Sequence, residues 1–147
     1  MRVLLLPVGE GTWCVPLVSV REVLTAPRTS PLPTAKESVV GLFNLRGSVL
    51  PLFDTGVLLG LPGCCPAGTC PAGTWGAHAA VVEVTAGLAA LVTTGTPRTA
   101  DLGPVVGAPE HPAALGTYDV VPLTGPDDAP DGTREVAVLL DLERLLG

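Results

Sequence analysis

The amino-acid sequence predicts an all-β fold with short helical segments, built as one β-barrel or a pair of barrels. Apolar runs of strand length recur along the 147 residues, and 18 glycines and 16 prolines place turn signals between them. Hydrophobic residues make up 47% of the chain, which is enough for a core and too many for a disordered protein. Because the chain has two Phe, two Trp, one Tyr and no Ile, this core must consist of valine, leucine and alanine.

Charge and hydropathy exclude two classes of partner. The net charge is −6, from 14 acidic and 8 basic residues, and no basic stripe or aromatic platform is present for a nucleic acid. No apolar run approaches the roughly 18–20 residues of a membrane span. The opening residues Met1–Val8 lack the features of a secretory signal and predict a first strand, so we expect a cytoplasmic protein.

The first third of the chain predicts a hairpin and then a helical turn. Arg2–Leu6 and Thr12–Pro16 flank a glycine-containing turn and are expected to pair. Apolar residues at 17, 20 and 24 have the spacing of a short amphipathic helix. Prolines at 27, 31 and 33 then predict a loop.

Residues 39–54 carry the clearest pattern, two apolar strands that meet at Arg46-Gly47. Gly47 is expected to supply a positive φ in a tight turn. Pro51 cannot donate a ladder hydrogen bond and favours an edge position. Asp54 is expected to cap a helical turn that contains Val57–Leu59.

The second half repeats the β pattern after a low-complexity stretch at 60–76, where Cys65–Thr69 is duplicated in tandem. That stretch is taken as a lobe boundary, and residues 95–116 are expected to be loop-like apart from Val105-Val106. An apolar strand, an aspartate and a helical turn occur at 49–59 and again at 136–146, and each copy could close one lobe. The other expected elements are strands at 79–84, 88–93, 117–123 and 134–140 and a helical turn at 141–146.

Catalytic and metal-binding motifs are weak. No nucleophile elbow, phosphate-binding loop or dinucleotide turn is present, so no enzyme activity, cofactor or catalytic residue is expected, although a triad assembled by folding stays open. Cys64, Cys65, Cys70 and His78 do not have the spacing of a compact zinc motif, which favours a loop with incidental thiols. A Cys65–Cys70 disulfide and a small metal-binding protein remain as alternatives.

Two charged residues are candidates for binding a partner. Arg46 is either a solvated turn residue or a rigidly held donor for a carboxylate. Glu22 is either a solvated residue or an acidic anchor beside Val20 and Val23. Charges next to exposed aliphatic residues are typical of the rim of a protein-binding patch.

Three segments together resemble the CheW-like domain family. Thr12–Leu24 resembles its signature aliphatic-Pro/Asp-aliphatic-x-x-Val-x-Glu-Val. Val40–Asp54 is similar to its most characteristic stretch, Gly-aliphatic-x-Asn-Leu-Arg-Gly-x-aliphatic-aliphatic-Pro-aliphatic-aliphatic-Asp. Val136–Leu146 is similar to its closing strand and helix, whereas residues 60–125 match only in strand rhythm.

The resemblance implies two SH3-like five-stranded β-barrel lobes that share a core. It implies a single domain over 1–147, with lobes at 12–75 and 76–140 and with the termini, 1–11 and 141–147, packing across them. It also implies a non-catalytic adaptor, located at receptor arrays, that couples chemoreceptor cytoplasmic tips to a CheA-type histidine kinase in chemotaxis or pilus-driven motility. A divergent structural or regulatory domain that has lost receptor binding is the alternative.

The resemblance also implies a set of receptor-side residues. Val20, Glu22, Gly41 and Arg46 fall where the family's receptor-contacting and assembly-sensitive positions lie. Kinase contact in the family is made largely through the second lobe, where this sequence is too divergent for residues to be assigned.

Overall fold

The structure is a computed structural model that describes residues 1–9, 11–25, 29–30, 38–61, 78–109, 111–122 and 135–146. Within these residues the chain is mostly β, with short helical turns between the strands. The elements are β1 (Arg2–Val8), β2 (Gly11–Pro16), η1 (Leu17–Ser19), β3 (Val20–Thr25), β4 (Val39–Leu45), β5 (Ser48–Phe53), α1 (Thr55–Leu58), β6 (His78–Val84), β7 (Gly87–Thr93), β8 (Arg98–Gly107), β9 (Ala114–Pro122), β10 (Val136–Leu140) and α2 (Leu142–Leu146).

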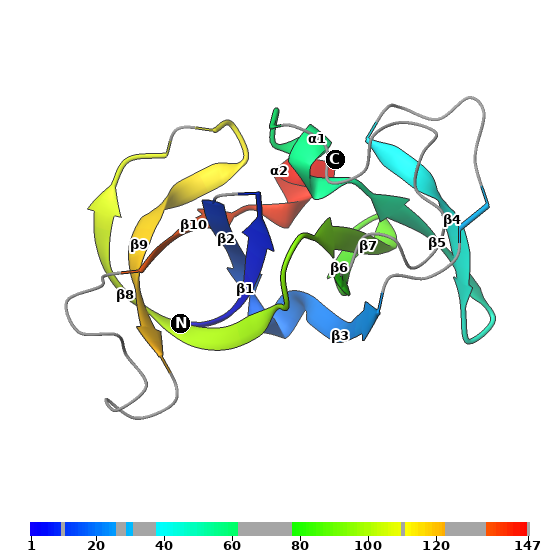
Figure 1. Cartoon of the computed structure of the whole chain (residues 1–147), viewed down its shortest axis with the longest axis horizontal. Helices are drawn as coiled ribbons and strands as arrows, with labels where there is room; N and C mark the ends of the chain where they lie inside the picture. Colours follow the sequence, from blue (N-terminus) through cyan, green and yellow to red (C-terminus); the bar gives the residue numbers. More distant parts are fainter. Residues whose placement is uncertain are drawn as a thin grey trace.

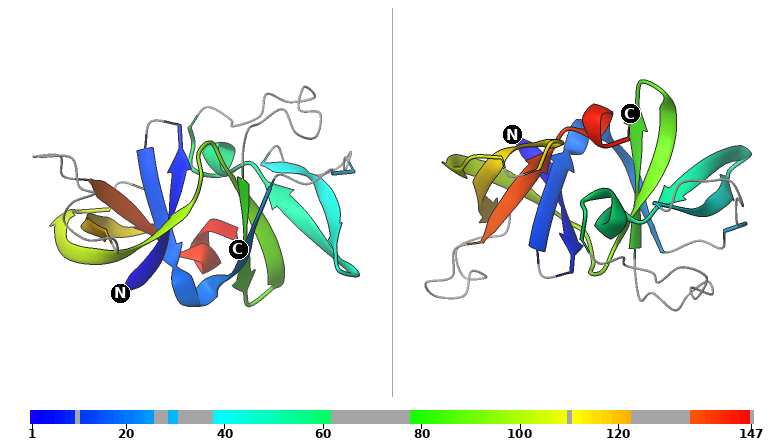
Figure 2. Two further views of the ribbon diagram at one scale, coloured as in Figure 1. Left: turned by 60° about the horizontal axis from the view of Figure 1, so that its bottom comes forward. Right: turned by 90° about the horizontal axis from the view of Figure 1, so that it is seen from above.

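The strands form two five-stranded sheets, and the predicted fold class is confirmed. One sheet is a closed barrel in the order β1-β2-β10-β9-β8, and the other, called here the second sheet, has the order β3-β6-β7-β5-β4. Ser30 and Leu42 exchange two backbone hydrogen bonds of 2.8 and 2.9 Å, so the chain that follows β3 pairs with β4 at the opposite end of the second sheet. Figures 1 and 2 show the two sheets side by side, with α2 between them.

The two sheets do not follow the expected lobes at 12–75 and 76–140. The barrel combines β1 and β2 with β8–β10, whereas β3–β7 make the second sheet. Two parallel pairings produce this arrangement, because β10 pairs with β2 and β5 pairs with β7. Strand patterns in the sequence show where strands lie but not which strands pair.

The buried side chains form three apolar clusters, because several strands are covered on both faces. In β1, Val3 and Leu5 face the barrel interior while Leu4 and Leu6 belong to the core shared by the two sheets. The interior of the second sheet is a separate cluster. Its members are Phe43, Leu50, Leu52, Ala79, Val81, Ala90 and Val92.

Several local predictions are confirmed, and three are wrong. The two hairpins around residues 9 and 46 form as expected, and the Asp54 carboxylate accepts a hydrogen bond from the Val57 amide at the start of α1. The predicted helical segment at 17–24 is instead a 3-10 turn followed by β3, since pairing with β6 outweighs a weak helical spacing. Within the predicted loop at 95–116, residues 98–107 instead form strand β8, whose alternation is interrupted by bulges.

Pro51 also differs from its predicted place, because β5 lies inside the second sheet between β4 and β7 rather than at an edge. The pairing of β5 with β7 begins at Leu52, one residue after the proline. The missing proline N–H is therefore tolerated where the ladder has not yet started. Residues 62–76 of the low-complexity stretch, with the cysteines at 64, 65 and 70, lie outside the described residues.

The two sheets share one plan of strand pairing. The order of the closed barrel can be written from β8 as β8-β1-β2-β10-β9, and this order matches β3-β6-β7-β5-β4 in the second sheet. Each pair of neighbouring strands is parallel or antiparallel in both sheets alike. The strand–aspartate–helix pattern noted in the sequence lies once in each sheet, as β5 with α1 and as β10 with α2. In the second copy the Asp141 carboxylate accepts from the amides of Glu143 and Arg144. The fold is thus an internal repeat of five strands. One unit is β3–β7, and the other consists of β8–β10 followed in the matching order by β1 and β2, the first two strands of the chain.

Candidate functional site

The turn between β4 and β5 is rigid and presents Arg46 to solvent. Arg46 and Gly47 have φ values of 51° and 91°, which define a tight two-residue hairpin turn. The Asn44 side-chain oxygen accepts a hydrogen bond of 2.9 Å from the Gly47 amide. The positive φ predicted for Gly47 is confirmed, whereas that of Arg46 was not expected, because non-glycine residues rarely adopt it.

Arg46 forms an ion pair with Glu22 of β3, at the opposite end of the second sheet from β4. The Arg46 Nη1 atom lies 2.5 Å from the Glu22 Oε2 atom, and the exposed fractions of the two side chains are 74% and 24%. The hydrogen bond to Glu22 and the charge of its carboxylate raise the pKa of Arg46 above its ordinary value. The pair is therefore a fixed, charged contact with an exposed basic side and a more sheltered acidic side.

The register explains how two residues 24 positions apart meet. Glu22 lies on β3, and Leu24, two residues later on the same face of that strand, packs against the interior cluster of the second sheet. Because β3 and β4 are the two ends of this sheet, the pair joins its first strand to the turn after its last strand. The sequence named both residues but did not indicate that they contact each other.

Val20 and Gly41 occupy structural positions on β3 and β4, the two strands that carry this pair. Val20 is the half-buried first residue of β3 and packs against the core that the two sheets share. Gly41 is buried, and a Cβ atom built on it would lie 2.6 Å from the Ser30 carbonyl oxygen and 2.9 Å from the Thr29 Cβ. A side chain at 41 would therefore displace the segment that pairs with β4, so Gly41 positions the chain and does not itself offer a contact surface.

An exposed valine accompanies the pair. Val49 follows the turn and is 63% exposed, whereas Val23, one residue after Glu22, lies on the opposite face of β3. We call Glu22, Asn44, Arg46 and Val49 the Glu22–Arg46 face. Its combination of an exposed aliphatic group and a held ion pair is typical of a protein-binding patch rather than of a reaction centre.

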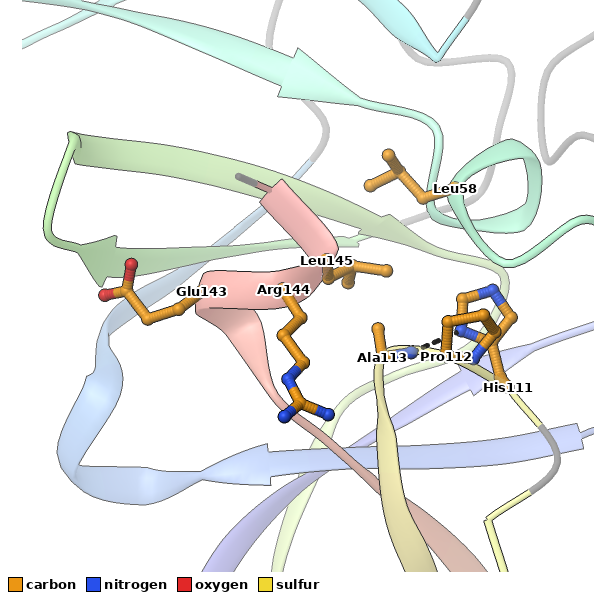
Figure 3. Close-up of a pocket in the computed structure, with 7 residues that line it drawn as sticks. All are labelled: Leu58, His111, Pro112, Ala113, Glu143, Arg144 and Leu145. Carbon is orange, nitrogen blue, oxygen red and sulfur yellow. Dashed lines mark hydrogen bonds between the residues drawn. The ribbon is translucent and has the colours of Figure 1, made fainter.

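A surface depression lies beside α2, and its polar groups do not converge on one point. It has a volume of about 520 Å³ and is lined by residues that include His111, Glu143 and Arg144. The His111 Nδ1 atom accepts a hydrogen bond of 3.0 Å from the Ala113 amide, and the Glu143 carboxylate accepts from the amide and hydroxyl of Thr85. Figure 3 shows the Glu143 and Arg144 side chains extending in different directions.

The described residues contain no cluster of three or more His, Cys, Asp or Glu side chains arranged to hold a metal ion. None of their helices has the length and hydropathy to span a membrane. Cys14 is a free cysteine inside the barrel, and its burial raises the pKa of its thiol to about 12.

Comparison with known proteins identifies relatives of the chain. Two curated relatives match over 59 residues, 40% of this chain and 38% of each relative: chemotaxis protein CheW of Rhizobium meliloti (strain 1021), 39% identical, and probable chemotaxis protein CheW of Rhizobium etli (strain ATCC 51251 / DSM 11541 / JCM 21823 / NBRC 15573 / CFN 42), 34% identical. These matches thus span well under half of the length of either relative.

A solved structure of another protein has the same fold as this chain. The crystal structure of the scaffolding protein TtCheW from Thermoanaerobacter tengcongensis superposes with a TM-score of 0.68, at 16% identity, over 98% of this chain and 90% of that one. Residues 2–147 match the CheW-like domain, whose members are non-catalytic scaffolds in chemotaxis signalling. This chain therefore belongs to the family of CheW-like domains.

Proposed function

We propose that this chain is a non-catalytic adaptor that couples chemoreceptor cytoplasmic tips to a CheA-type histidine kinase, in chemotaxis or in pilus-driven motility. The observation that carries the proposal is the Glu22–Arg46 face, on which a charged pair is held beside the exposed Val49. An adaptor with these partners acts in the cytoplasm, at receptor arrays.

The face has the chemistry to fix the register of a protein partner. A guanidinium carries five N–H donors, and the contact with Glu22 uses the Nη1 end, so other donors of the exposed Arg46 side chain can reach a partner carboxylate or carbonyl. The hairpin turn holds this side chain in place, which lowers the entropy lost on binding. The exposed Val49 on the same face supplies apolar area.

Val20 and Gly41 help to position the two strands that carry this face. Val20 anchors the start of β3 on the shared core, and Gly41 allows the Thr29-Ser30 segment to lie against β4. We propose that these two residues act on receptor binding through the positions of β3 and β4. The kinase would then bind the barrel, because the Glu22–Arg46 face lies on the second sheet and a receptor bound there would leave the barrel accessible.

Calorimetric titration of a soluble receptor-tip fragment tests the receptor side. Because Arg46 and Glu22 both belong to the proposed contact, we expect Glu22→Lys and Arg46→Glu each to weaken binding by several-fold or more while the chain stays folded. Arg2→Glu is the matched control, since it breaks an exposed ion pair with Asp101 on the barrel. Unchanged affinity in both test variants would refute the assignment.

A pull-down distinguishes the adaptor from the alternative, a divergent domain without a receptor partner. The tagged chain is incubated with receptor-tip fragments and with the CheA-type kinase of the same cell. Capture of both supports the adaptor, and capture of neither supports the alternative.

A further inference from the structure

The second sheet contains an apolar groove between β5 and β7. The groove has a volume of about 450 Å³, and the described residues that line it carry no charge. Val49 and Pro51 form one wall, Gly87 and Ala89 form the other, and Leu146 of α2 also lines it. We call this space the β5–β7 groove.

Strand pairing explains why the groove exists. The two strands are in register at Leu52↔Ala90 and Phe53↔Leu91, and the pairing begins directly after Pro51, which has no N–H to donate. The residues of β5 before this point line the groove instead of continuing the ladder. The groove is thus a consequence of the backbone arrangement and not of one side-chain rotamer.

The shared plan of the two sheets identifies the equivalent place in the barrel. The pair Leu52↔Ala90 lies two residues before the capping Asp54, and Leu139↔Cys14 lies two residues before the capping Asp141. Ala90 on β7 therefore corresponds to Cys14 on β2. One residue earlier, Ala89 corresponds to Trp13, and three residues earlier, Gly87 corresponds to Gly11.

In the barrel this place is filled by an indole ring. Trp13 packs against the core shared by the sheets, and its Nε1 atom lies 3.2 Å from the position of a Cβ on Gly11. In the second sheet, the residue at the tryptophan position is Ala89, and both Ala89 and Gly87 line the open groove. The space that the ring occupies over one glycine is open over the other.

We propose that the β5–β7 groove receives an aromatic side chain, tryptophan or phenylalanine, from a protein partner. Trp13 supplies the intramolecular template for this occupant, and the uncharged lining favours an apolar ring over a charged group. Ser48 and Val49 directly follow the turn that carries Arg46, so the groove is continuous with the Glu22–Arg46 face. A buried aromatic anchor beside a charged rim is the arrangement in which a few residues carry most of the binding energy.

The first experiment uses a small probe and needs neither the receptor nor the kinase. N-acetyl-L-tryptophanamide is titrated into the full isotope-labelled chain, with N-acetyl-L-leucinamide as the aliphatic control. The proposal predicts saturable amide shifts at Gly87, Leu88 and Leu146, and at least tenfold weaker binding of the leucine analogue. Absence of saturable shifts at these residues would overturn the proposal even if the adaptor function holds.

Two variants locate the site. Ala89→Trp should place an indole in the groove from within the chain, so it should raise the thermal midpoint and abolish probe binding, whereas Ala90→Trp, on the packed interior face, should lower the midpoint. Val49→Asp changes an exposed wall residue and should weaken the probe at least tenfold in a folded protein. Full probe binding to either Ala89→Trp or Val49→Asp would show that the ring binds elsewhere and would contradict the proposal.

Discussion

The barrel and the second sheet follow one plan of strand pairing, yet they use it differently. Glu22 faces Val81 in the second sheet, and Arg98 faces Leu5 at the corresponding register position in the barrel. Each of the two residues forms an ion pair near the connection between the last two strands of its sheet, Glu22 with Arg46 and Arg98 with Glu135. An ion pair therefore stands at the corresponding place in both sheets, but the order of the charges is exchanged.

The comparison separates the effect of an ion pair on stability from its effect on the binding of a partner. An ion pair of either polarity can join the strands, since its energy depends on the distance between the charges and not on which strand carries which. A partner that docks on one face senses the order of the charges. The groove shows the same division, because the barrel places Trp13 where the second sheet has Ala89 and leaves a space.

The largest difference expected between the sheets concerns Cys14, which corresponds to Ala90. Burial raises the pKa of its thiol from 9.0 to about 12, so the folded state favours the neutral thiol. Stability from this group is present below pH 9 and is lost as the pH rises from 9 toward 12, by up to about 4 kcal/mol at 1.36 kcal/mol per pKa unit. Urea denaturation of the parent and of Cys14→Ala at pH 7, 9 and 10.5 measures it.

The difference between these two proteins is the informative quantity, because other groups also titrate at high pH. The parent should lose more stability than Cys14→Ala as the pH rises. Parallel pH dependences for the two would show that the thiol is not buried as described.

A smaller effect is expected at glycines that lie under neighbouring backbone. Gly41→Ala places a methyl group 2.6 Å from the Ser30 carbonyl, and we expect a loss of about 1–3 kcal/mol in the free energy of unfolding. Gly103→Ala in the barrel meets its nearest atoms at 3.3 Å and should cost clearly less. Chemical denaturation of both variants checks this order, and equal losses would contradict it.

The smallest effect on stability is expected for the exposed ion pairs. Surface pairs contribute little because solvent screens them. Exchanging the charges, with Glu22→Arg combined with Arg46→Glu, gives the second sheet the polarity of the barrel. Its denaturation midpoint should stay close to that of the parent, and a midpoint as low as that of Gly41→Ala would show that polarity matters to folding.

Local chemistry made part of this structure predictable from the sequence. The turn at Arg46-Gly47 and the cap at Asp54 depend on neighbouring residues, and both were predicted. The apolar residues at 17, 20 and 24 fit a helical period, but pairing with β6 makes Val20–Thr25 a strand. The parallel pairings that mix the two halves of the chain have no local signal.

The candidate site was predictable residue by residue but not as an arrangement. Glu22 and Arg46 were each identified as candidates, while their contact depends on how the ends of the second sheet meet. The equivalence of Ala89 and Trp13 appears only once the registers of both sheets are known. Burial of Gly41 under Ser30 likewise depends on a contact between distant strands.

The affinity of the charge-exchanged variant for a receptor-tip fragment tests the central claim most directly. Calorimetry on Glu22→Arg combined with Arg46→Glu separates a contact that a partner reads from one that merely joins two strands. Our account predicts a folded protein whose binding is weakened at least several-fold, as in the single variants. Recovery of the parent's affinity would contradict it, because the pair would then serve the fold alone.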